Sequence, residues 1–234
     1  MPISGHMPVA VDHVRETVSE VRSRIAAARS RGGHGQEVTL VAVTKTHGPD
    51  AVEAAYAAGV LDVGENKVQE AEGKMAQVAV PVRWHLIGHL QRNKARSALR
   101  FDLVHSMDSE RLAAALHDEA VKAARSLDVL LQVNVSGEDS KGGVALADVP
   151  ALADRLHALG TLRVRGVMTM APFEAAEATL RTVFAGARTA RVALQQAGHP
   201  AEWLSMGMSG DYEIAVEEGA THVRLGTVLF GSRT

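Results

Sequence analysis

The spacing of apolar residues near the N-terminus predicts a helix. Apolar side chains recur there at intervals of three and four positions, which places them on one helical face. They are Val11, Val14, Val18, Val21 and Ile25. Three glycines within residues 31–36 end this periodicity. The run at residues 38–43 comes next, and its β-branched side chains predict a strand buried on both faces of a parallel sheet.

Strand-like and helix-like segments continue to alternate toward the C-terminus. Further strands are expected at residues 61–63, 82–87, 103–105, 129–135, 162–168, 203–206 and 222–225. Helices are expected at residues 49–58, 67–77, 93–100, 109–125, 148–159, 175–197 and 211–218. Strands that alternate with helices need crossover connections, and such connections produce a parallel sheet.

Eight expected strands are the number that closes a TIM-type (β/α)8 barrel, an α/β fold. The 234 residues approach the roughly 250 typical of this barrel and are too few for a second domain of comparable size. We therefore expect a single domain over residues 1–234, with an N-terminal helix and loop at residues 1–36 packing on the barrel. A doubly wound open sheet is the alternative, although the Rossmann version lacks its G-x-G-x-x-G motif here.

Composition excludes several classes of protein. Hydrophobic residues make up 46% of the chain and aromatic residues 3%, so Ala, Val, Leu and Met must build the core. A net charge of −2 differs from the basic excess of nucleic-acid-binding proteins, and the absence of cysteine excludes disulfides, zinc–thiolate sites and thiol catalysis. Residues 1–10 do not resemble a signal peptide, and no apolar run approaches the roughly 20 residues of a membrane helix. We expect a cytoplasmic protein that contacts neither membrane nor nucleic acid.

Functional residues of such barrels gather at the C-terminal ends of the strands. Lys45 follows the first strand by two residues, where it would leave an apolar wall and enter the barrel mouth. Partial removal from water favours the neutral amine, which is the form that attacks a carbonyl carbon. The alternative is a solvated loop lysine, and position alone does not separate the two interpretations.

The loops after the last two strands have the features of a phosphate site, and phosphate often binds there in this fold. Residues 206–211 contain Ser209 between glycines and lead into a short helix, whose first N–H groups attract anions. Residues 224–227 add Arg224, Gly226 and Thr227. An ordinary serine N-cap is the plainer explanation of the first loop.

The closed barrel would bring these loops close to the lysine, because its last strand pairs with its first. Lys45 and the two loops are then placed to share one ligand, and an aldehyde-bearing phosphate ester fits both. Asn66, after the second strand, either contacts that ligand or caps the next helix. His85 is either a mouth residue or a hydrogen-bonded core histidine. No metal site is expected, because His85 and His89 flank a strand end without a carboxylate at ligand spacing.

At these positions the sequence resembles the YggS/PROSC family of pyridoxal 5′-phosphate (PLP) homeostasis proteins, which is related to the barrel domain of alanine racemase. The resemblance runs from about residue 38 to the C-terminus. Its segments are LVAVTKTH around Lys45, VGENKVQEA at 63–71, RWHLIGHLQRNK at 83–94, LLQVNVSGEDSKGG at 130–143, VRGVMTM at 164–170 and LSMGMSGDYEIAVEEGATHVRLGTVLFG at 204–231. Thr44 stands where serine is frequent in the family, and Leu86 where an aromatic residue is frequent.

The resemblance implies a cofactor and its contacts. Lys45 would hold PLP as a Schiff base, the internal aldimine, and Arg224 would face the pyridine nitrogen. The residues that would hold the phosphate or line the rest of the pocket are Ser209, Gly226, Thr227, Asn66 and His85. No catalytic residue and no metal ligand are assigned.

The same resemblance favours a carrier over an enzyme. Arginine beside the pyridine nitrogen disfavours its protonation, whereas PLP enzymes that need a strong electron sink usually place an acid there. Racemases of the related fold also take a tyrosine base from an additional domain and a partner subunit, and such a domain is not expected here. We therefore expect a PLP homeostasis protein that is a monomer and serves PLP-dependent apoenzymes.

Two alternatives stay open. A small PLP-dependent amino-acid racemase would need Tyr212, near the loop after the seventh expected strand, as its second base. A phosphosugar-binding barrel enzyme would instead use Lys45 for aldol chemistry and would carry no PLP.

Overall fold

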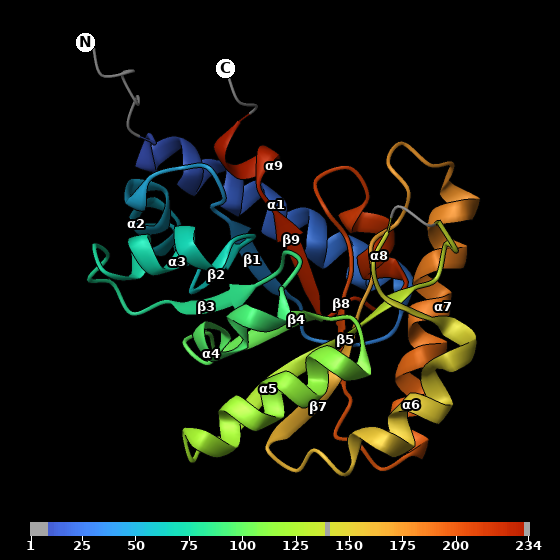
Figure 1. Ribbon diagram of the computed structural model, residues 1–234. Helices are drawn as coiled ribbons and strands as arrows, with labels where there is room; N and C mark the ends of the chain where they lie inside the picture. The colour runs from blue at the N-terminus through green and yellow to red at the C-terminus, as the bar shows by residue number, and fades with distance from the viewer. Residues whose placement is uncertain (1–8, 139–140, 232–234) are drawn as a thin grey trace.

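A computed structural model describes residues 9–138 and 141–231 of the chain. In this part, eight parallel strands form a barrel with helices around its outside (Figure 1). The barrel strands are β1 (Thr39–Val43), β2 (Asp62–Glu65), β3 (Arg83–Leu86), β4 (Leu103–Met107), β5 (Leu127–Asn134), β7 (Leu162–Met168), β8 (Trp203–Ser205) and β9 (His222–Leu225). Since β1 pairs with both β2 and β9, and β4 with both β3 and β5, the sheet closes on itself. The predicted TIM-type fold is confirmed, and the open-sheet alternative is wrong.

Helices connect the strands in the predicted order. They are α1 (Val11–Gly32), α2 (Pro49–Ala57), α3 (Val68–Met75), α4 (Ala95–Ala98), α5 (Glu110–Lys122), α6 (Val149–Leu156), α7 (Glu177–Gln196), α8 (Tyr212–Glu217) and α9 (Thr227–Phe230). Short 3₁₀ turns at Arg92–Lys94 and Leu146–Asp148 precede α4 and α6. The sequence pattern missed α9 and the two-residue strand β6 (Val144–Ala145), which pairs with β5 outside the barrel.

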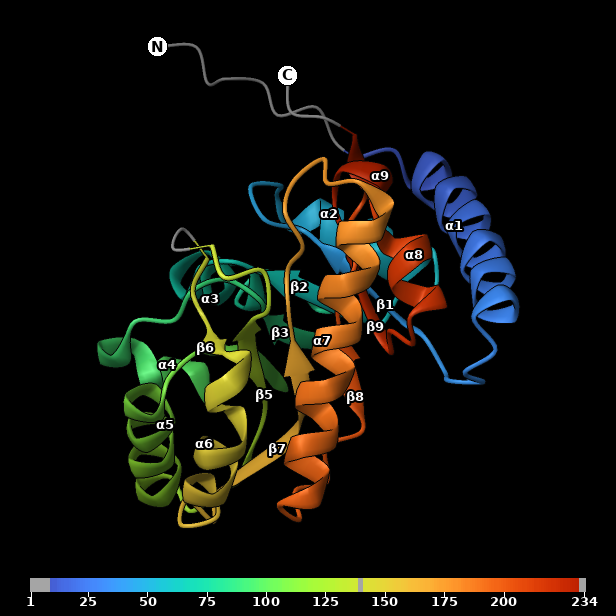
Figure 2. The same cartoon turned by 90° about the vertical axis from the view of Figure 1, so that its right-hand side faces the viewer.

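The N-terminal helix α1 covers one side of the barrel. It lies beside α2, α8 and α9 (Figure 2). Its buried face contains Val14, Val18 and Val21 from the predicted stripe, whereas Val11 at its start is exposed. The helix ends at Gly33, whose left-handed φ of 69° lets its N–H donate to the carbonyl of Arg29. The expectation about a signal segment falls mostly on residues 1–8, which lie outside the described residues.

The core has two parts. The larger apolar cluster lies between the strands and the surrounding helices and is mostly aliphatic, as the composition predicted. A separate small cluster contains Leu103, Leu130 and Met168. Polar side chains, including His105 and Arg224, are buried on the same strands. The interior is therefore more polar than the expected aliphatic layers. None of the helices within the described ranges is long and apolar enough to cross a membrane.

Candidate functional site

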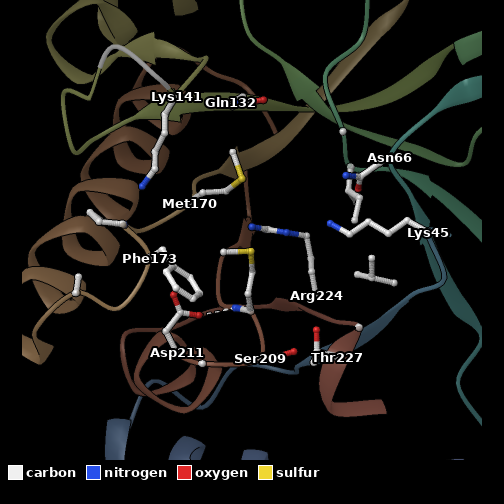
Figure 3. Close-up of a pocket in the computed structure, with 18 of the residues that line it drawn as sticks. Lys45, Asn66, Gln132, Lys141, Met170, Phe173, Ser209, Asp211, Arg224 and Thr227 are labelled. Atoms are coloured by element: carbon white, nitrogen blue, oxygen red, sulfur yellow. Dashed lines mark hydrogen bonds between the residues drawn. The ribbon is translucent and has the colours of Figure 1, made fainter. Parts of the chain in front are cut away.

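A cavity of about 920 Å³ opens at the C-terminal ends of the barrel strands. Every residue predicted for the site lines it except His85. The six that line it are Lys45, Asn66, Ser209, Arg224, Gly226 and Thr227. Lys45 and Arg224 extend into the cavity from neighbouring strands, and Ser209 and Thr227 lie together on the side away from Asn66 (Figure 3). The strand-end rule thus predicted from the sequence that these residues would lie together at this end of the barrel.

Lys45 is half-buried and lies in the loop after β1. Its two neighbours are held tightly. Thr44 is fully buried, its backbone N–H donates to the carbonyl of Gly64, and its hydroxyl donates to Oε1 of Glu65 over 2.6 Å. Thr46 has a left-handed φ of 66°, and its backbone N–H donates to the carboxylate of Glu70. The loop that presents the lysine is therefore fixed on both sides.

A buried lysine joins these two anchors. Nζ of Lys74 donates to Oε1 of Glu65 over 2.6 Å, to Oε1 of Glu70 over 2.9 Å and to the carbonyl of Thr44 over 2.7 Å. Burial raises the pKa of Glu65, although the hydrogen bonds from Lys74 and Thr44 oppose that shift. The network was not predicted because lysine is usually solvated, although Lys74 follows the buried Val68 and Ala71 at the three-residue spacing of one helical face.

Arg224 is a buried cation at the cavity wall. Its guanidinium donates to Oγ of Ser205 over 2.6 Å and to the carbonyl of Thr169 over 3.0 Å. Burial lowers its pKa to about 10, and the negative charge of Asp211 opposes the shift. The group therefore remains charged at neutral pH and attracts an electron pair or an anion in the cavity.

The loop of residues 206–211 folds back on itself to form one wall of the cavity. Gly207 has φ of +95°, and a Cβ atom there would lie 2.7 Å from Cβ of Ala215 and 2.9 Å from Cα of Tyr212. The backbone N–H of Met208 donates to Oδ1 of Asp211, whose pKa burial raises. Helix α9 contacts this loop, since the backbone N–H of Val228 donates to Oγ of Ser209 over 3.4 Å.

The sequence analysis missed several residues that line the cavity. Met170 and Gln132 lie at the ends of β7 and β5, where the strand-end rule could have found them. Phe173 is 88% exposed at the rim. Nζ of Lys141 is buried and lies 3.4 Å from the carboxylate of Glu138, yet it makes no hydrogen bond within the described residues. The cavity wall thus contains a second amine whose hydrogen-bonding capacity is not used.

Two residues considered from the sequence lie elsewhere. His85 is buried inside the barrel, where it contacts Asp62 and His105, and it lines an opening at the N-terminal end of the strands. The prediction that it lines the mouth is wrong, because its position on β3 is two residues before the cavity residue Ile87. Tyr212 is not among the described residues at the cavity; it is buried at the start of α8, which packs on α1, and its hydroxyl makes no hydrogen bond in the described part of the chain.

Comparisons with known proteins agree with this geometry. Residues 17–234 match the model of the alanine racemase N-terminal domain. The fold is similar to that of alanine racemase from Streptomyces lavendulae, with a TM-score of 0.75 at 21% sequence identity. The similarity covers 97% of this chain and 58% of that one. The fold and the strand-end cavity therefore define a barrel of the alanine racemase N-terminal class.

Relatives with higher sequence identity show which family within this class the chain belongs to. The pyridoxal phosphate homeostasis protein of Pseudomonas aeruginosa is 44% identical, covering 94% of this chain and 96% of that protein. Its Escherichia coli K12 counterpart is 38% identical over 95% and 98%. PipY of Synechococcus elongatus, a COG0325 family member solved with PLP bound, has a TM-score of 0.83 at 40% identity and covers 93% of this chain and 100% of that one. The chain belongs to the family of pyridoxal phosphate homeostasis proteins.

Proposed function

We propose that this protein binds PLP in the mouth cavity, attached to Lys45 as a Schiff base, and acts in PLP homeostasis. One observation supports this more than any other. A half-buried lysine amine and a buried arginine cation lie in one cavity with the two loops that the sequence resemblance assigns to the phosphate. The PLP-bound structure of the related PipY supports the choice of ligand.

The residues of the cavity fit such a ligand. Lys141 adds a second amine to the cavity wall: its buried Nζ lies 3.4 Å from the carboxylate of Glu138 and makes no hydrogen bond in the described part of the chain. A Cβ atom on Gly226 would approach the carbonyl oxygen of Val43 to 3.2 Å, so glycine lets the end of β9 pack closely on β1 at the cavity. Ser209, Gly226 and Thr227 would hold the phosphate, and Asn66 would line the ring side of the cavity.

PLP supplies an aldehyde on a conjugated ring. The neutral amine of Lys45 would attack the aldehyde carbon and form a carbon–nitrogen double bond with loss of one water. The cation of Arg224 would face the ring nitrogen and disfavour its protonation. This arrangement holds and protects the aldehyde rather than activating it as an electron sink.

The racemase alternative is not favoured. It needs a second base at the cavity, and its sequence candidate Tyr212 is instead buried at the start of α8, on the α1 side of the barrel. Burial also raises the pKa of Tyr212, so a phenolate is harder to form there.

The decisive experiment is reduction of the Schiff base. Purified protein mixed with PLP should absorb visible light, and borohydride should add the reduced ligand mass to a peptide that contains Lys45. Lys45→Ala should lose this absorption and the added mass. The matched control, Lys122→Ala at an exposed position near the end of α5, should keep both. A colourless wild type, or a mass on another lysine alone, would overturn the proposal.

As a carrier, the protein should release PLP to a recipient. We propose that it acts in the cytoplasm as a monomer and supplies PLP-dependent apoenzymes. Loaded protein, freed of unbound PLP, should restore activity to an apoenzyme even when a scavenger removes PLP from solution. Transfer that vanishes with the scavenger would show that the carrier only releases PLP to solvent.

A further inference from the structure

A path of hydrogen bonds crosses the inside of the barrel and ends at Arg224. The hydrogen-bond path consists of Asp62, His85, His105, Ser205 and Arg224, which lie on β2, β3, β4, β8 and β9. Its bonds join Asp62 Oδ1 to His85 Nε2 over 3.0 Å, His85 Nδ1 to His105 Nε2 over 2.8 Å, His105 Nδ1 to Ser205 Oγ over 2.8 Å, and Ser205 Oγ to the Arg224 guanidinium over 2.6 Å. Because β4 and β8 are not neighbours in the sheet, the bond between His105 and Ser205 spans the barrel interior.

The path connects the two ends of the barrel. Asp62 and His85 line a cavity of about 510 Å³ at the N-terminal ends of the strands, where Arg83 also donates to Asp62. Arg224 lines the mouth cavity at the other end. Every side chain in the path is at least nine-tenths buried, so each must find its hydrogen-bond partners within the protein.

The two ends of the path have fixed hydrogen-bonding roles, one as donor and the other as acceptor. The guanidinium of Arg224 can only donate, and an ionised carboxylate can only accept. Burial alone would raise the pKa of Asp62, but the hydrogen bonds from His85 and Arg83 outweigh it and lower the pKa to about 2. Burial also lowers the pKa of His105 well below its ordinary value, so this imidazole is neutral at pH 7.

If His85, like His105, has a single proton, these ends permit one direction of donation. Ser205 accepts from Arg224 and must give its own proton to Nδ1 of His105. The proton of His105 then lies on Nε2 and is donated to Nδ1 of His85. The remaining proton of His85 lies on Nε2 and is donated to Asp62. Reversing any single link leaves two donors or two acceptors facing each other elsewhere in the path.

We propose that Ser205 and His105 are positioning residues for Arg224, and that the hydrogen-bond path from Asp62 sets how Arg224 meets the ligand in the mouth. The hydroxyl of Ser205 keeps a lone pair toward the guanidinium because its proton is committed to His105. The acceptors Ser205 and Thr169 then fix the plane of the guanidinium, and with it the N–H groups left for the cavity. This inference rests on the proposed function only for the identity of the ligand.

Ligand-free protein provides the first test. Nitrogen-15 NMR of the histidine side chains should find His85 and His105 each with a single proton, on Nε2, at pH 7. A proton on Nδ1 of His105, or two protons on His85, would reverse the path and overturn the inference. This measurement needs no PLP, so it remains decisive if the proposed function fails.

A pair of serine variants provides the second test. Ser205→Ala removes the acceptor of Arg224, whereas Ser106→Ala removes a hydroxyl that is equally buried and makes no hydrogen bond in the described part of the chain. We expect Ser205→Ala to weaken PLP binding about tenfold, the effect of losing one hydrogen bond to a charged group. It should also shift the absorbance of the bound ligand and the pH at which that absorbance changes. Ser106→Ala should bind like the wild type.

Asp62→Asn tests whether a change at the far end of the hydrogen-bond path alters the absorbance of the bound ligand. Asp62 lies at that far end and does not line the mouth cavity. Its bound-ligand spectrum should shift in the same direction as that of Ser205→Ala. The inference is overturned if folded Ser205→Ala binds PLP with the affinity and spectrum of the Ser106→Ala control. A wild type that binds no PLP would instead count against the proposed function.

Discussion

Lys74 shows how one buried charge can support the loop that presents a cavity residue, Lys45. It connects Glu65 and Glu70, which in turn hold the threonines on either side of Lys45. Its side chain is 6% exposed and that of Glu65 is fully buried, so each charge depends on the other for compensation. The pair therefore stabilises the conformation of the loop that presents Lys45.

We expect Lys74→Met to lower the free energy of unfolding by about 3–5 kcal/mol, because it leaves Glu65 buried without its cation. Urea denaturation followed by circular dichroism measures this loss. Reduction by borohydride should also become slower or incomplete, since the loop that contains Lys45 loses its anchors. The double variant Glu65→Gln/Lys74→Met removes both charges and should recover most of the lost stability.

The pH dependence of the free energy of unfolding separates the effect of the lost charge from the effect of lost packing in Lys74→Met. Burial raises the pKa of Glu65 in the folded state, so folding favours its protonated form. The cost of the unpaired carboxylate is therefore absent well below the unfolded pKa of about 4.3 and grows as the pH rises through the folded value. The stability deficit of Lys74→Met should be smaller at pH 5 than at pH 8. An equal deficit at both would indicate lost packing instead.

The sequence predicted which residues lie at the strand ends better than it predicted where His85 and Lys74 lie within the fold. Lys45, Arg224 and Ser209 lie where the strand-end rule placed them, because that rule depends only on chain order in a closed barrel. His85 was misplaced because a strand pattern shows which residues share a face, not how far along the barrel axis each one lies. The burial of Lys74 was equally hidden, since it depends on how α3 packs on β2.

At the scale of elements, the conformation of the loop after β8 depends on one glycine, Gly207. Gly207→Ala places a methyl group against Ala215 and Tyr212 at a φ of +95°, so both packing and backbone are strained. We expect it to destabilise the protein by about 1–3 kcal/mol and to weaken PLP binding by moving Ser209. Thermal unfolding and a PLP titration measure the two effects.

The same loop contains its own control. A Cβ atom on Gly210 would meet no atom within 4 Å, and its φ is not left-handed. Gly210→Ala should therefore leave stability and PLP affinity near those of the wild type. If both variants weaken binding alike, flexibility of the loop rather than the backbone at Gly207 would be the determining property.

Helix and strand positions followed from hydrophobic periodicity, and the exceptions have physical causes. α9 has four residues, too few for a helical period to show, and β6 has two. Val11 is 38% exposed although it continues the spacing of the buried stripe, because it lies in the first turn of α1, near the end of the packed face. Periodicity therefore predicts long elements well and short ones poorly.

At the scale of the whole molecule, the barrel encloses histidines that the sequence did not place there. His105 and His222 have their ring centres 6.1 Å apart, and both are buried. Burial lowers the pKa of His222 to about 3 and lowers the pKa of His105 well below its ordinary value. Folding thus holds two imidazoles in the neutral form.

This burial makes the stability of the whole protein depend on pH. An unfolded histidine gains a proton as the pH falls below about 6.5, whereas these two cannot do so in the folded protein until far lower pH. The unfolded state then binds more protons, and the free energy of unfolding falls on acidification. Each histidine contributes a slope that approaches about 1.4 kcal/mol per pH unit. Two give up to about 2.7 kcal/mol per unit between pH 6 and the folded pKa values.

Urea denaturation of the ligand-free protein at pH 7.5, 6 and 5 measures this slope. Stability should change little above pH 7, where both folded and unfolded imidazoles are neutral, and should fall steeply below pH 6. His222→Gln removes one of the two titrating groups without touching the hydrogen-bond path, so its slope between pH 6 and 5 should be smaller by about 1.4 kcal/mol per unit. An unchanged slope in this variant would mean that His222 takes up its proton in the folded barrel, and that the interior is more open to water than its burial indicates.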